Sequence, residues 1–475
     1  MSADINLKPA FDSEIIDIAR YVSTPMVYPS KTMDIARLCL LDSMGCALLS
    51  LQHPECTKLL GPIVPGATLL NGARVPGTAF ELDPIQAAFN IGTMIRWLDY
   101  NDTWLAQEWG HPSDNLGGIL AAADYLSRHQ KPLLMQDVLT AMIQAYEIQG
   151  ILALENSFNR IGIDHVALVK IATTAVVSRL LDLDESQICA ALSQAFIDGH
   201  SLRTYRHAPN TGWRKSWAAG DATARGVKLA WLTLRGEQGY PSALSAKRWG
   251  LYEVLFQGKP FKFERAYDHY VIENILFKIT YPAEFHAQTA IECAVALYPQ
   301  VRDRLSDIDK IVIHTQEPAM RILNKTGPLH NPADRDHSLQ YILAIGLIHG
   351  TLTAAHYQDN FAADIRIDQL RNKMQVIEKL QFSKDYLDPE KRSIANAIQI
   401  FFKDGTKTIE VSIEYPIGHR RRRAEGAPLL LQKFHQSLLS CFSINKANSL
   451  FELCQHQETL EKMPLNEFMA LWVKP

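Results

Sequence analysis

The sequence lacks the cysteine patterns that mark a disulfide framework or a metal cluster. Its seven cysteines are odd in number and no two of them form a CxxC pair, which argues against a zinc ribbon and a closely spaced iron–sulfur motif. Scattered single cysteines are typical of a reducing compartment. We therefore expect a cytoplasmic protein without a bound metal or another cofactor.

Long apolar runs and a targeting signal are also missing. No stretch is apolar over the roughly 18 residues that a membrane-spanning helix needs, and the N-terminal stretch MSADINLKPAFDSE has no basic-then-apolar pattern. Neither sign of charge is in excess, since 48 Lys and Arg residues stand against 51 Asp and Glu residues. We expect no membrane partner and no general attraction to nucleic acid.

The sequence also lacks an internal repeat and a low-complexity tract, and helical periodicity dominates it to about residue 250. The predicted helices in this part cover 13–22, 32–49, 84–100, 115–128, 135–155, 165–181, 184–199 and 221–236. Several are apolar almost all round, as in the run KIATTAVV, which is typical of central helices in a large bundle. A chain of 475 residues exceeds the usual size of one core, so two domains are expected.

Strand patterns appear near residue 270. The predicted strands cover 275–282, 308–316 and 398–416, and the helices around and after them cover 286–298, 336–350, 429–442, 448–462 and 466–473. The last strand pattern is a hairpin around Asp404 and Gly405. The predicted fold is mostly α with an α+β insert. It has a large all-helical domain built from both chain ends (1–270 and 425–475) and a smaller α+β domain over 271–424.

An unusual polar stretch, LDYNDTWLAQEWGHPSDN, overlaps the end of the predicted helix over 84–100. Asp99 and Thr103 are four residues apart, so we expect both on one face of that helix. Pro112 ends or redirects the helix, which places His111 in a short junction before the next helix. The stretch is either a capped corner with packed Trp rings or part of an active site.

Two further stretches place basic or imidazole side chains at a helix start. In NRIGIDHVALVK, Asp164 is a predicted N-cap and His165 lies in the first turn of a very apolar helix. In RTYRHAPNTGWRKSWAAGDATA, basic residues crowd a loop before the next helix, namely Arg203, Arg206, Arg214 and Lys215. Either stretch alone is also typical of a solvated helix start or surface loop. Helix starts favour anions and neutral histidines, so a crevice where the three stretches meet would hold a small polycarboxylate.

The α+β part offers further candidates. TYPAEFHAQ contains Tyr281, Glu284 and His286, and His286 is predicted to begin a helix after a strand. In RDHSLQY, Tyr341 lies one turn after His337, where core packing is the simpler explanation. The run GHRRRR is either a solvated, charge-dense segment or an anion-binding one, and the acidic chain has no wider basic face for nucleic acid.

Six stretches in chain order carry a resemblance to a known family. They are LDYNDTWLAQEWGHPSDN, IGIDHVALVK, GWRKSWAAGDA, YPAEFHAQTA, DHSLQYILAIGL and YPIGHRRRR, and with them the sequence resembles the MmgE/PrpD family over nearly its whole length. The resemblance implies a helical domain assembled from both chain ends, an inserted α+β lid domain and a homodimer with its active site between the domains. It also implies a metal- and iron–sulfur-independent hydro-lyase. Its small-molecule tricarboxylate substrate, 2-methylcitrate, would lose water to give 2-methyl-cis-aconitate in propionate catabolism (the methylcitrate cycle).

The resemblance also implies site residues. Active-site residues of the related cis-aconitate decarboxylase branch correspond here to Asp99, Thr103, His111, His165, Lys215 and Tyr341. The stretch from Thr103 to His111 is longer in this sequence than in that branch. The longer form favours the dehydratase side of the family.

Loss of water from such an acid takes a proton from a carbon next to a carboxylate and expels a hydroxyl group. We expect His111 and His165 to supply the acid–base pair, in either assignment. Lys215, with Arg214, is expected to stabilise the charge that builds on the carboxylate. Asp99 is expected to orient a histidine or the leaving hydroxyl, and Thr103 to donate a hydrogen bond to a carboxylate. Tyr341 is expected to protonate the leaving group after lid closure, and His286 to bind the substrate.

Other functions stay open at this point. The nearest is decarboxylation of cis-aconitate, or hydration and dehydration of citrate-like acids, by another enzyme of the same family. A different class is a non-catalytic helical scaffold that binds an acidic partner through GHRRRR, and a third is nucleic-acid binding with a steep salt dependence. The clustering of Asp99, His111, His165 and Lys215 at helix starts favours an enzyme.

Overall fold

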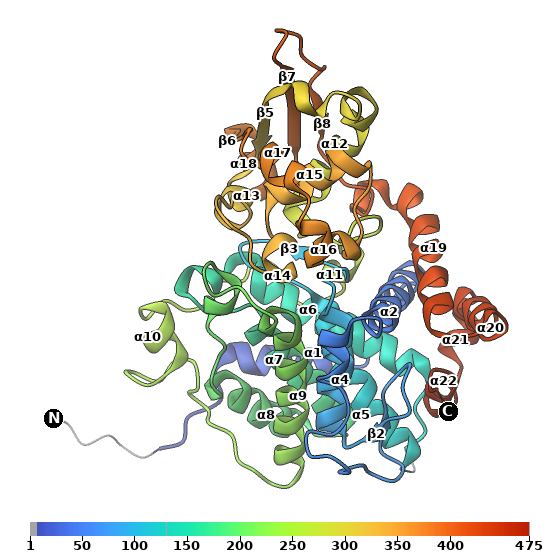
Figure 1. The fold of residues 1–475 in the computed structure, drawn as a ribbon. Coiled ribbons are helices and arrows are strands. Elements are labelled where there is room, and N and C mark those ends of the chain that lie inside the picture. The colour runs from blue at the N-terminus through green and yellow to red at the C-terminus, as the bar shows by residue number, and fades with distance from the viewer. Residues whose placement is uncertain (1–6, 130, 475) are drawn as a thin grey trace.

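We describe residues 7–129 and 131–474 in a computed structural model of the chain (Figure 1). Helices fill the broad lower part of the molecule in this view, and a four-stranded sheet stands in the narrower upper part. The mostly helical fold with an α+β portion agrees with the prediction. The division of the chain into two domains stays a prediction.

Long helices form the lower part, and apolar periodicity predicts most of them. They are α1 (Ser13–Ser23), α2 (Ser30–Ser50), α4 (Pro84–Arg96), α5 (Leu116–Arg128), α6 (Met135–Glu155), α7 (Val166–Leu180), α8 (Glu185–Ile197) and α9 (Arg214–Leu234). Shorter elements lie between or after them, namely α3 (Pro54–Thr57), β1 (Ala73–Arg74), β2 (Glu81–Leu82), α10 (Leu251–Phe256) and α11 (Tyr270–Glu273). The side chain of Asp83 caps α4 by accepting from the backbone N–H groups of Ile85 and Gln86.

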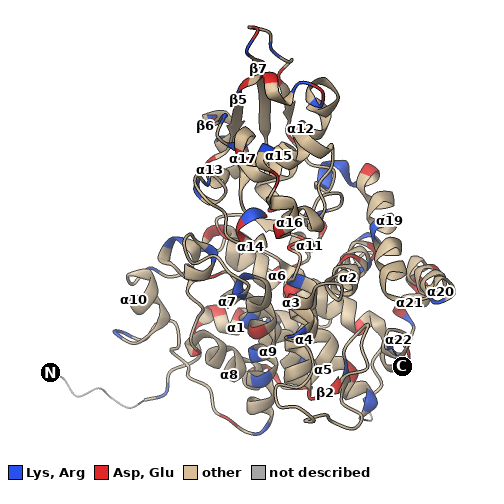
Figure 2. Cartoon of the chain, viewed as in Figure 1, with Lys and Arg blue, Asp and Glu red and all other residues tan. Residues whose placement is uncertain are grey.

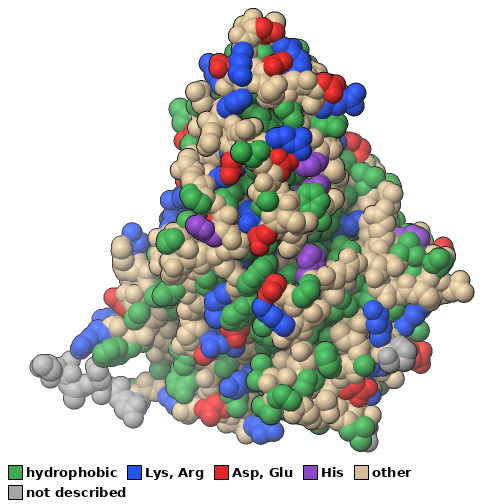
Figure 3. Space-filling model, viewed as in Figure 1, with side chains coloured by type: hydrophobic (Ala, Val, Ile, Leu, Met, Phe, Trp, Pro, Cys, Tyr) green, Lys and Arg blue, Asp and Glu red, His purple; other side chains and the backbone are tan. Residues whose placement is uncertain are grey.

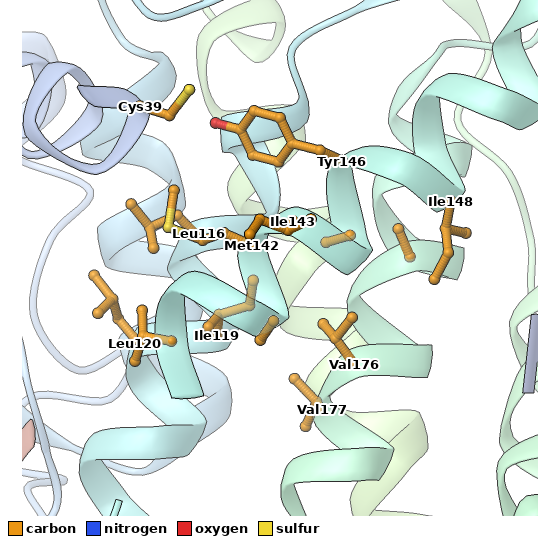
Figure 4. Packing of buried hydrophobic residues seen from close by; sticks show 14 of the residues in the cluster. Cys39, Leu116, Ile119, Leu120, Met142, Ile143, Tyr146, Ile148, Val176 and Val177 are labelled. Carbon is orange, nitrogen blue, oxygen red and sulfur yellow. The ribbon is translucent and has the colours of Figure 1, made fainter. Parts of the chain in front are cut away.

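One apolar cluster joins these helices. Ile119 of α5, Ile143 of α6 and Val176 of α7 belong to it and are fully buried, and Figure 4 shows their side chains between the helices. Burial of one such side chain contributes roughly 1.5–3 kcal/mol. Both α6 and α7 are buried on nearly every face, so the prediction that the run KIATTAVV marks a central helix is confirmed.

The upper part has its own sheet and its own apolar cluster. Its strands are β5 (Ile308–Thr315), β6 (Met374–Glu378), β7 (Asn396–Phe402) and β8 (Val411–Ile413), in the spatial order β6-β5-β7-β8. β5 pairs parallel with β6 and antiparallel with β7, and β7 forms the predicted hairpin with β8. The helices are α12 (Gln288–Val301), α13 (Glu317–Ile322), α14 (Pro332–Arg335), α15 (Leu339–His349), α16 (Asp359–Ala362), α17 (Ile365–Arg371) and α18 (Leu380–Leu387). α12 packs against β7, β8 and α15, and its apolar side chains join the second cluster.

The C-terminal helices return to the helical part (Figure 1). They are α19 (Arg423–Cys441), α20 (Ile444–Gln455), α21 (Gln457–Glu461) and α22 (Leu465–Leu471). α19 packs along α2, where Lys433 donates a buried hydrogen bond of 2.8 Å to Asp42. Gly45 permits the close approach, because a Cβ there would lie 3.2 Å from the Oγ of Ser437. Both chain ends therefore build the helical part.

The predicted strand over 275–282 is wrong. This segment forms no regular strand, and Leu276 makes only an isolated bridge with Thr103. Its apolar side chains are divided between the two clusters, with Phe277 in the helical one and Tyr281 in that of the α+β part. The segment is apolar because it is buried where the two parts join, not because it pairs in a sheet.

Candidate active site

The polar stretch between α4 and α5 is irregular rather than helical. α4 ends at Arg96, and Asp99 takes a left-handed backbone conformation with φ of 49°, which Asp tolerates better than most residues. The prediction that Asp99 and Thr103 share one helix face is therefore wrong. Thr103 instead exchanges two backbone hydrogen bonds with Leu276, at 2.7 and 3.0 Å. These bonds tie the stretch to the segment that leads into the α+β part.

A short hairpin then carries His111 to a helix start. β3 (Trp104–Leu105) pairs antiparallel with β4 (Trp109–Gly110), and the 3₁₀ helix η1 (Pro112–Asn115) leads into α5. The Nδ1 of His111 lies 2.6 Å from the carbonyl oxygen of Asp102. Since a carbonyl only accepts, Nδ1 carries the proton and Nε2 has a free lone pair. His111 thus lies in the predicted junction, ready to accept a proton at Nε2.

The carboxylate of Asp99 is the centre of a buried charge cluster. Its Oδ1 accepts hydrogen bonds of 2.5 Å from Arg96 and from Lys278. The Nε2 atoms of His111 and His337 lie 3.8 and 3.9 Å from its two oxygens. Burial would raise the pKa of Asp99, but Arg96 and Lys278 outweigh burial and hold it well below its ordinary value. Asp99 is therefore a fixed negative charge between cations from two distant parts of the chain.

Lys215 extends this cluster into the α+β part. It lies in the first turn of α9, which begins seven residues earlier than the sequence predicts, at Arg214 rather than Asp221. Its Nζ lies 2.5 Å from Asp336 Oδ1 and 3.0 Å from His337 Nδ1. Burial lowers the pKa of Lys215, although Asp336 opposes this. Lys215 thus holds residues 336–337 of the α+β part against the helical part.

His165 lies beside His111, at the start of α7. The two ring centroids are 5.6 Å apart. Neither ring nitrogen of His165 has a hydrogen-bond partner among the residues that the structure describes. Its Nδ1 is 3.1 Å from Asp164 Oδ1, but without hydrogen-bond geometry. Burial lowers the pKa of both histidines well below the ordinary value, so both rings are neutral at pH 7 and able to accept a proton.

Acidic side chains hold the loops around the histidines. Asp102 accepts from Tyr146 at 2.5 Å and from the Ser113 hydroxyl at 2.7 Å, and burial raises its pKa to about 6. Asp164 accepts from Nε of Arg206. These contacts fix both ends of the His111 segment and the start of α7. The polar groups beside the Trp rings are therefore mostly buried and paired rather than solvated.

The structure does not bring every predicted site residue to this cluster. Arg214, 40% exposed at its side chain, stacks on the ring of Trp217 at 4.3 Å and lies 3.7 Å from Asp221, because neighbouring residues on a helix point in different directions. The hydroxyl of Tyr341 donates to the His356 carbonyl at 2.6 Å, and burial raises its pKa to about 12.

His286 lies near the cluster rather than in it. Its ring is fully buried between Glu284, at 2.9 Å, and the Tyr386 hydroxyl, at 3.2 Å. The predicted strand before it is absent, and the 3₁₀ helix η4 (Phe285–Ala287) begins at its neighbour. The structure thus places Arg214 and His286 outside the charge cluster, and their substrate contacts stay predictions.

A cavity of about 580 Å³ lies beside the charge cluster, between the helical and α+β parts. The stacked rings of Trp97 and Trp213, 5.2 Å apart, form part of its wall, each two residues before a member of the cluster. The α+β part contributes Pro282 and the segment 352–355. This volume suits a small ligand, although none of the residues that line the cavity belongs to the charge cluster itself.

The run GHRRRR is mostly engaged within the protein, not solvated. His419 is fully buried, and Arg423 donates to the Ile275 carbonyl at 2.6 Å. Arg422 donates to Glu292 at 3.2 Å and to Glu425 at 2.9 Å. On the face seen in Figures 2 and 3, basic and acidic side chains are interspersed. The run therefore ties segments together, which removes the main support for the scaffold and nucleic-acid alternatives.

Several site residues are missed by sequence reasoning. Arg96 lies in a predicted helix and Lys278 in a predicted strand, and no sequence pattern points to a role for Asp336. Lys278 carries a signal, since a lysine in the middle of the apolar run ILFKITYP needs a buried partner. That partner, Asp99, is far away in sequence, so only the fold identifies it.

Two kinds of feature are absent from residues 7–129 and 131–474. No helix in these ranges is long and apolar enough to cross a membrane. Within the same ranges, no group of three or more His, Cys, Asp or Glu side chains is arranged to hold a metal ion.

The sequence matches two family models in succession. The MmgE/PrpD N-terminal domain matches residues 16–264, and the MmgE/PrpD C-terminal domain matches residues 281–457. The chain is 58% identical to the 2-methylcitrate dehydratase of Escherichia coli (strain K12) over 100% of both chains. It is 56% identical to that of Cupriavidus necator over 98% of both chains. With the mitochondrial 2-methylcitrate dehydratase of Yarrowia lipolytica the identity is 55%, over 99% of this chain and 92% of the relative.

Proposed function

The chain belongs to the MmgE/PrpD family, and we propose that it is a hydro-lyase that removes water from 2-methylcitrate to give 2-methyl-cis-aconitate in propionate catabolism. The observation that carries this proposal is the meeting of two neutral histidines and several buried cations beside Asp99. Such a site attracts a polycarboxylate and offers bases that are unprotonated at neutral pH. The names of its full-length relatives supply the substrate.

The geometry favours one assignment of the histidines. His111 takes the proton at Nε2, because its Nδ1 proton is donated to the Asp102 carbonyl. Asp99, 3.8 Å from Nε2, then stabilises the imidazolium that forms. His165, with both ring nitrogens free, gives its N–H proton to the leaving hydroxyl, in the way that a neutral imidazole acts in other enzymes. The bond from carbon to hydroxyl breaks as the proton leaves the neighbouring carbon, and water departs.

The remaining side chains bind and orient. Lys215 places a positive charge where the substrate carboxylate gains electron density, and Thr103, whose Oγ1 lies 3.4 Å from His111 Nδ1, is positioned to donate to a carboxylate. We do not assign proton donation to Tyr341, because its hydroxyl proton is already given to the His356 carbonyl. Tyr341 instead stacks on Tyr357, with 6.1 Å between the ring centroids, and so contributes to packing within the α+β part.

We also propose that the reaction needs no metal ion. Arg96, Lys278 and Lys215 supply the positive charge that a Lewis acid would otherwise supply. A homodimer is proposed as well, since large apolar side chains such as Trp249 and Val254 are 77% and 61% exposed. Light scattering of the purified chain tests the dimer. The cytoplasmic location stays a prediction.

The experiment that tests the function compares three substrates. Purified enzyme is incubated with 2-methylcitrate, citrate or cis-aconitate, with and without a chelator, while near-ultraviolet absorbance and carbon dioxide are followed. The proposal predicts an unsaturated acid from 2-methylcitrate, at the same rate with chelator. Carbon dioxide release from cis-aconitate would instead favour the decarboxylase alternative, and turnover of none of the three would refute the proposal.

A further inference from the structure

Two buried arginines beside His165 are not fully used by contacts within the chain. Arg203 and Arg206 form the ends of the 3₁₀ helix η3 (Arg203–Arg206) and are only 5% and 7% exposed. Within the described parts of the chain, Nη1 of Arg203 and Nη2 of Arg206 have no hydrogen-bond partner. A buried guanidinium nitrogen without an acceptor is costly, so an acceptor from outside the chain would stabilise both arginines.

Nearby carboxylates do not supply that acceptor. Asp164 accepts a hydrogen bond from Nε of Arg206, but it accepts none from Nη2 of the same arginine. Oε2 of Glu108 accepts two hydrogen bonds of 2.7 Å from Asn159. The other oxygen, Oε1, lies 3.9 Å from Nη1 of Arg203, which is too far for a hydrogen bond. Burial raises the pKa of Glu108 to about 7, against the effect of Arg203. One positive charge of the pair therefore lacks a full counter-charge at neutral pH.

The position of this pair indicates which anion it takes. Asp164, the partner of Arg206, is 3.1 Å from the ring of His165, whose nitrogens are also unpartnered. The ring centroid of His111 lies 5.6 Å from that of His165. An anion on the arginines would thus sit next to both histidines, and a guanidinium binds a carboxylate through parallel hydrogen bonds.

We propose that Arg203 and Arg206 hold one carboxylate of the substrate beside His165, and that this contact selects tricarboxylates over dicarboxylates. The assignment rests on the proposed function, which supplies the class of ligand. Trp109 helps to fix Arg203, whose guanidinium lies 5.8 Å from the centre of the indole ring. A second substrate carboxylate is left for Lys215, whose backbone carbonyl accepts a hydrogen bond from Arg206 Nη1 at 3.4 Å.

The same Trp ring provides a matched control. Arg321 stacks on Trp109 at 5.0 Å but is partly exposed, and its nitrogens are paired with Glu317 at 3.1 Å and Asn159 at 2.7 Å. Arg321→Gln therefore removes an arginine from the same ring without touching the unpartnered pair. Arg203→Gln removes the buried charge and keeps hydrogen-bonding groups.

Calorimetric binding of two non-reacting acids tests the proposal. Tricarballylate has three carboxylates, and methylsuccinate is the same skeleton with one terminal carboxylate removed. We expect Arg203→Gln to raise the Kd for tricarballylate at least 30-fold and to reduce the preference for tricarballylate over methylsuccinate to less than threefold. Arg321→Gln should leave both Kd values within threefold of wild type.

Other outcomes overturn the proposal. One is that the wild-type protein fails to bind tricarballylate. A second is that Arg203→Gln binds tricarballylate with a Kd within threefold of wild type. A third is that Arg203→Gln loses affinity for tricarballylate and methylsuccinate equally. If Arg203→Gln does not fold, a crystal structure of wild type with tricarballylate decides: a carboxylate oxygen within hydrogen-bond distance of Arg203 Nη1 is expected, and water or an adventitious ion alone there refutes the site. Binding needs no turnover, so wild type that binds tricarballylate through Arg203 but does not dehydrate 2-methylcitrate refutes only the proposed function.

Discussion

Glu108 allows a quantitative test of the burial of the site. Burial raises its pKa to about 7 from an ordinary value of 4.5. The native protein therefore keeps a proton on Glu108 between pH 4.5 and 7 that the unfolded chain releases. Since the native state binds more protons in this window, its stability falls as pH rises through it and is constant above about pH 7. At about 1.36 kcal/mol for each pH unit, the loss of stability from pH 5 to pH 8 is roughly 2–3 kcal/mol.

The variant Glu108→Gln has no carboxyl group to titrate, so its stability should not fall between pH 5 and pH 8 for this reason. The glutamine keeps an oxygen acceptor for Asn159. Urea unfolding of wild type and variant at pH 5 and pH 8 gives the difference in free energy of unfolding at each pH. We expect that difference to shift by about 2–3 kcal/mol in favour of the variant at pH 8. Any effect of the substitution that does not depend on pH, such as a change in packing, cancels between the two pH values. A shift below about 0.5 kcal/mol would mean that Glu108 is solvated or fully paired, and would refute the account of its burial.

Three further substitutions test the site from other directions. Lys278→Met leaves the buried charge of Asp99 with one cation fewer, and urea unfolding should show a loss of about 3–5 kcal/mol; an unchanged midpoint would contradict the ion pair. Gly110→Ala puts a Cβ 3.0 Å from Nε2 of Gln149 and 3.3 Å from Cδ2 of His165, so kcat should fall at least threefold with little change in Tm. A normal kcat would show that the His165 ring is not held there. Tyr341→Phe should lower kcat by less than tenfold, since its hydroxyl bonds to a carbonyl; a fall above a hundredfold would restore its role as proton donor.

The helices are the part of the fold that the sequence predicts well, because their periodicity is a local property. The prediction fails where burial depends on distant partners. The run over 275–282 alternates like a strand, but it is buried on both sides where two apolar clusters meet. The helix that begins at Pro84 is predicted to reach residue 100, and it ends at Arg96 because Asp99 turns toward two cations.

The site is predicted in the same uneven way. His111, His165 and Lys215 are found because each follows a recognisable helix-start pattern, and the structure links them through Asp99 and His337. Arg214 and Lys215 are adjacent and equally basic, and only the packing of α9 shows that Lys215 points inward. Sequence spacing fixes which residues share a helix face, but not which face the fold buries.

The most direct test of the proposed chemistry is the turnover of 2-methylcitrate by His111→Asn and His165→Asn. Formation of the unsaturated acid is followed by near-ultraviolet absorbance, with circular dichroism to verify the fold of each variant. We expect each kcat to fall at least tenfold, since a positioned acid or base contributes about 10²- to 10⁴-fold. Near-normal turnover by both folded variants would contradict the account.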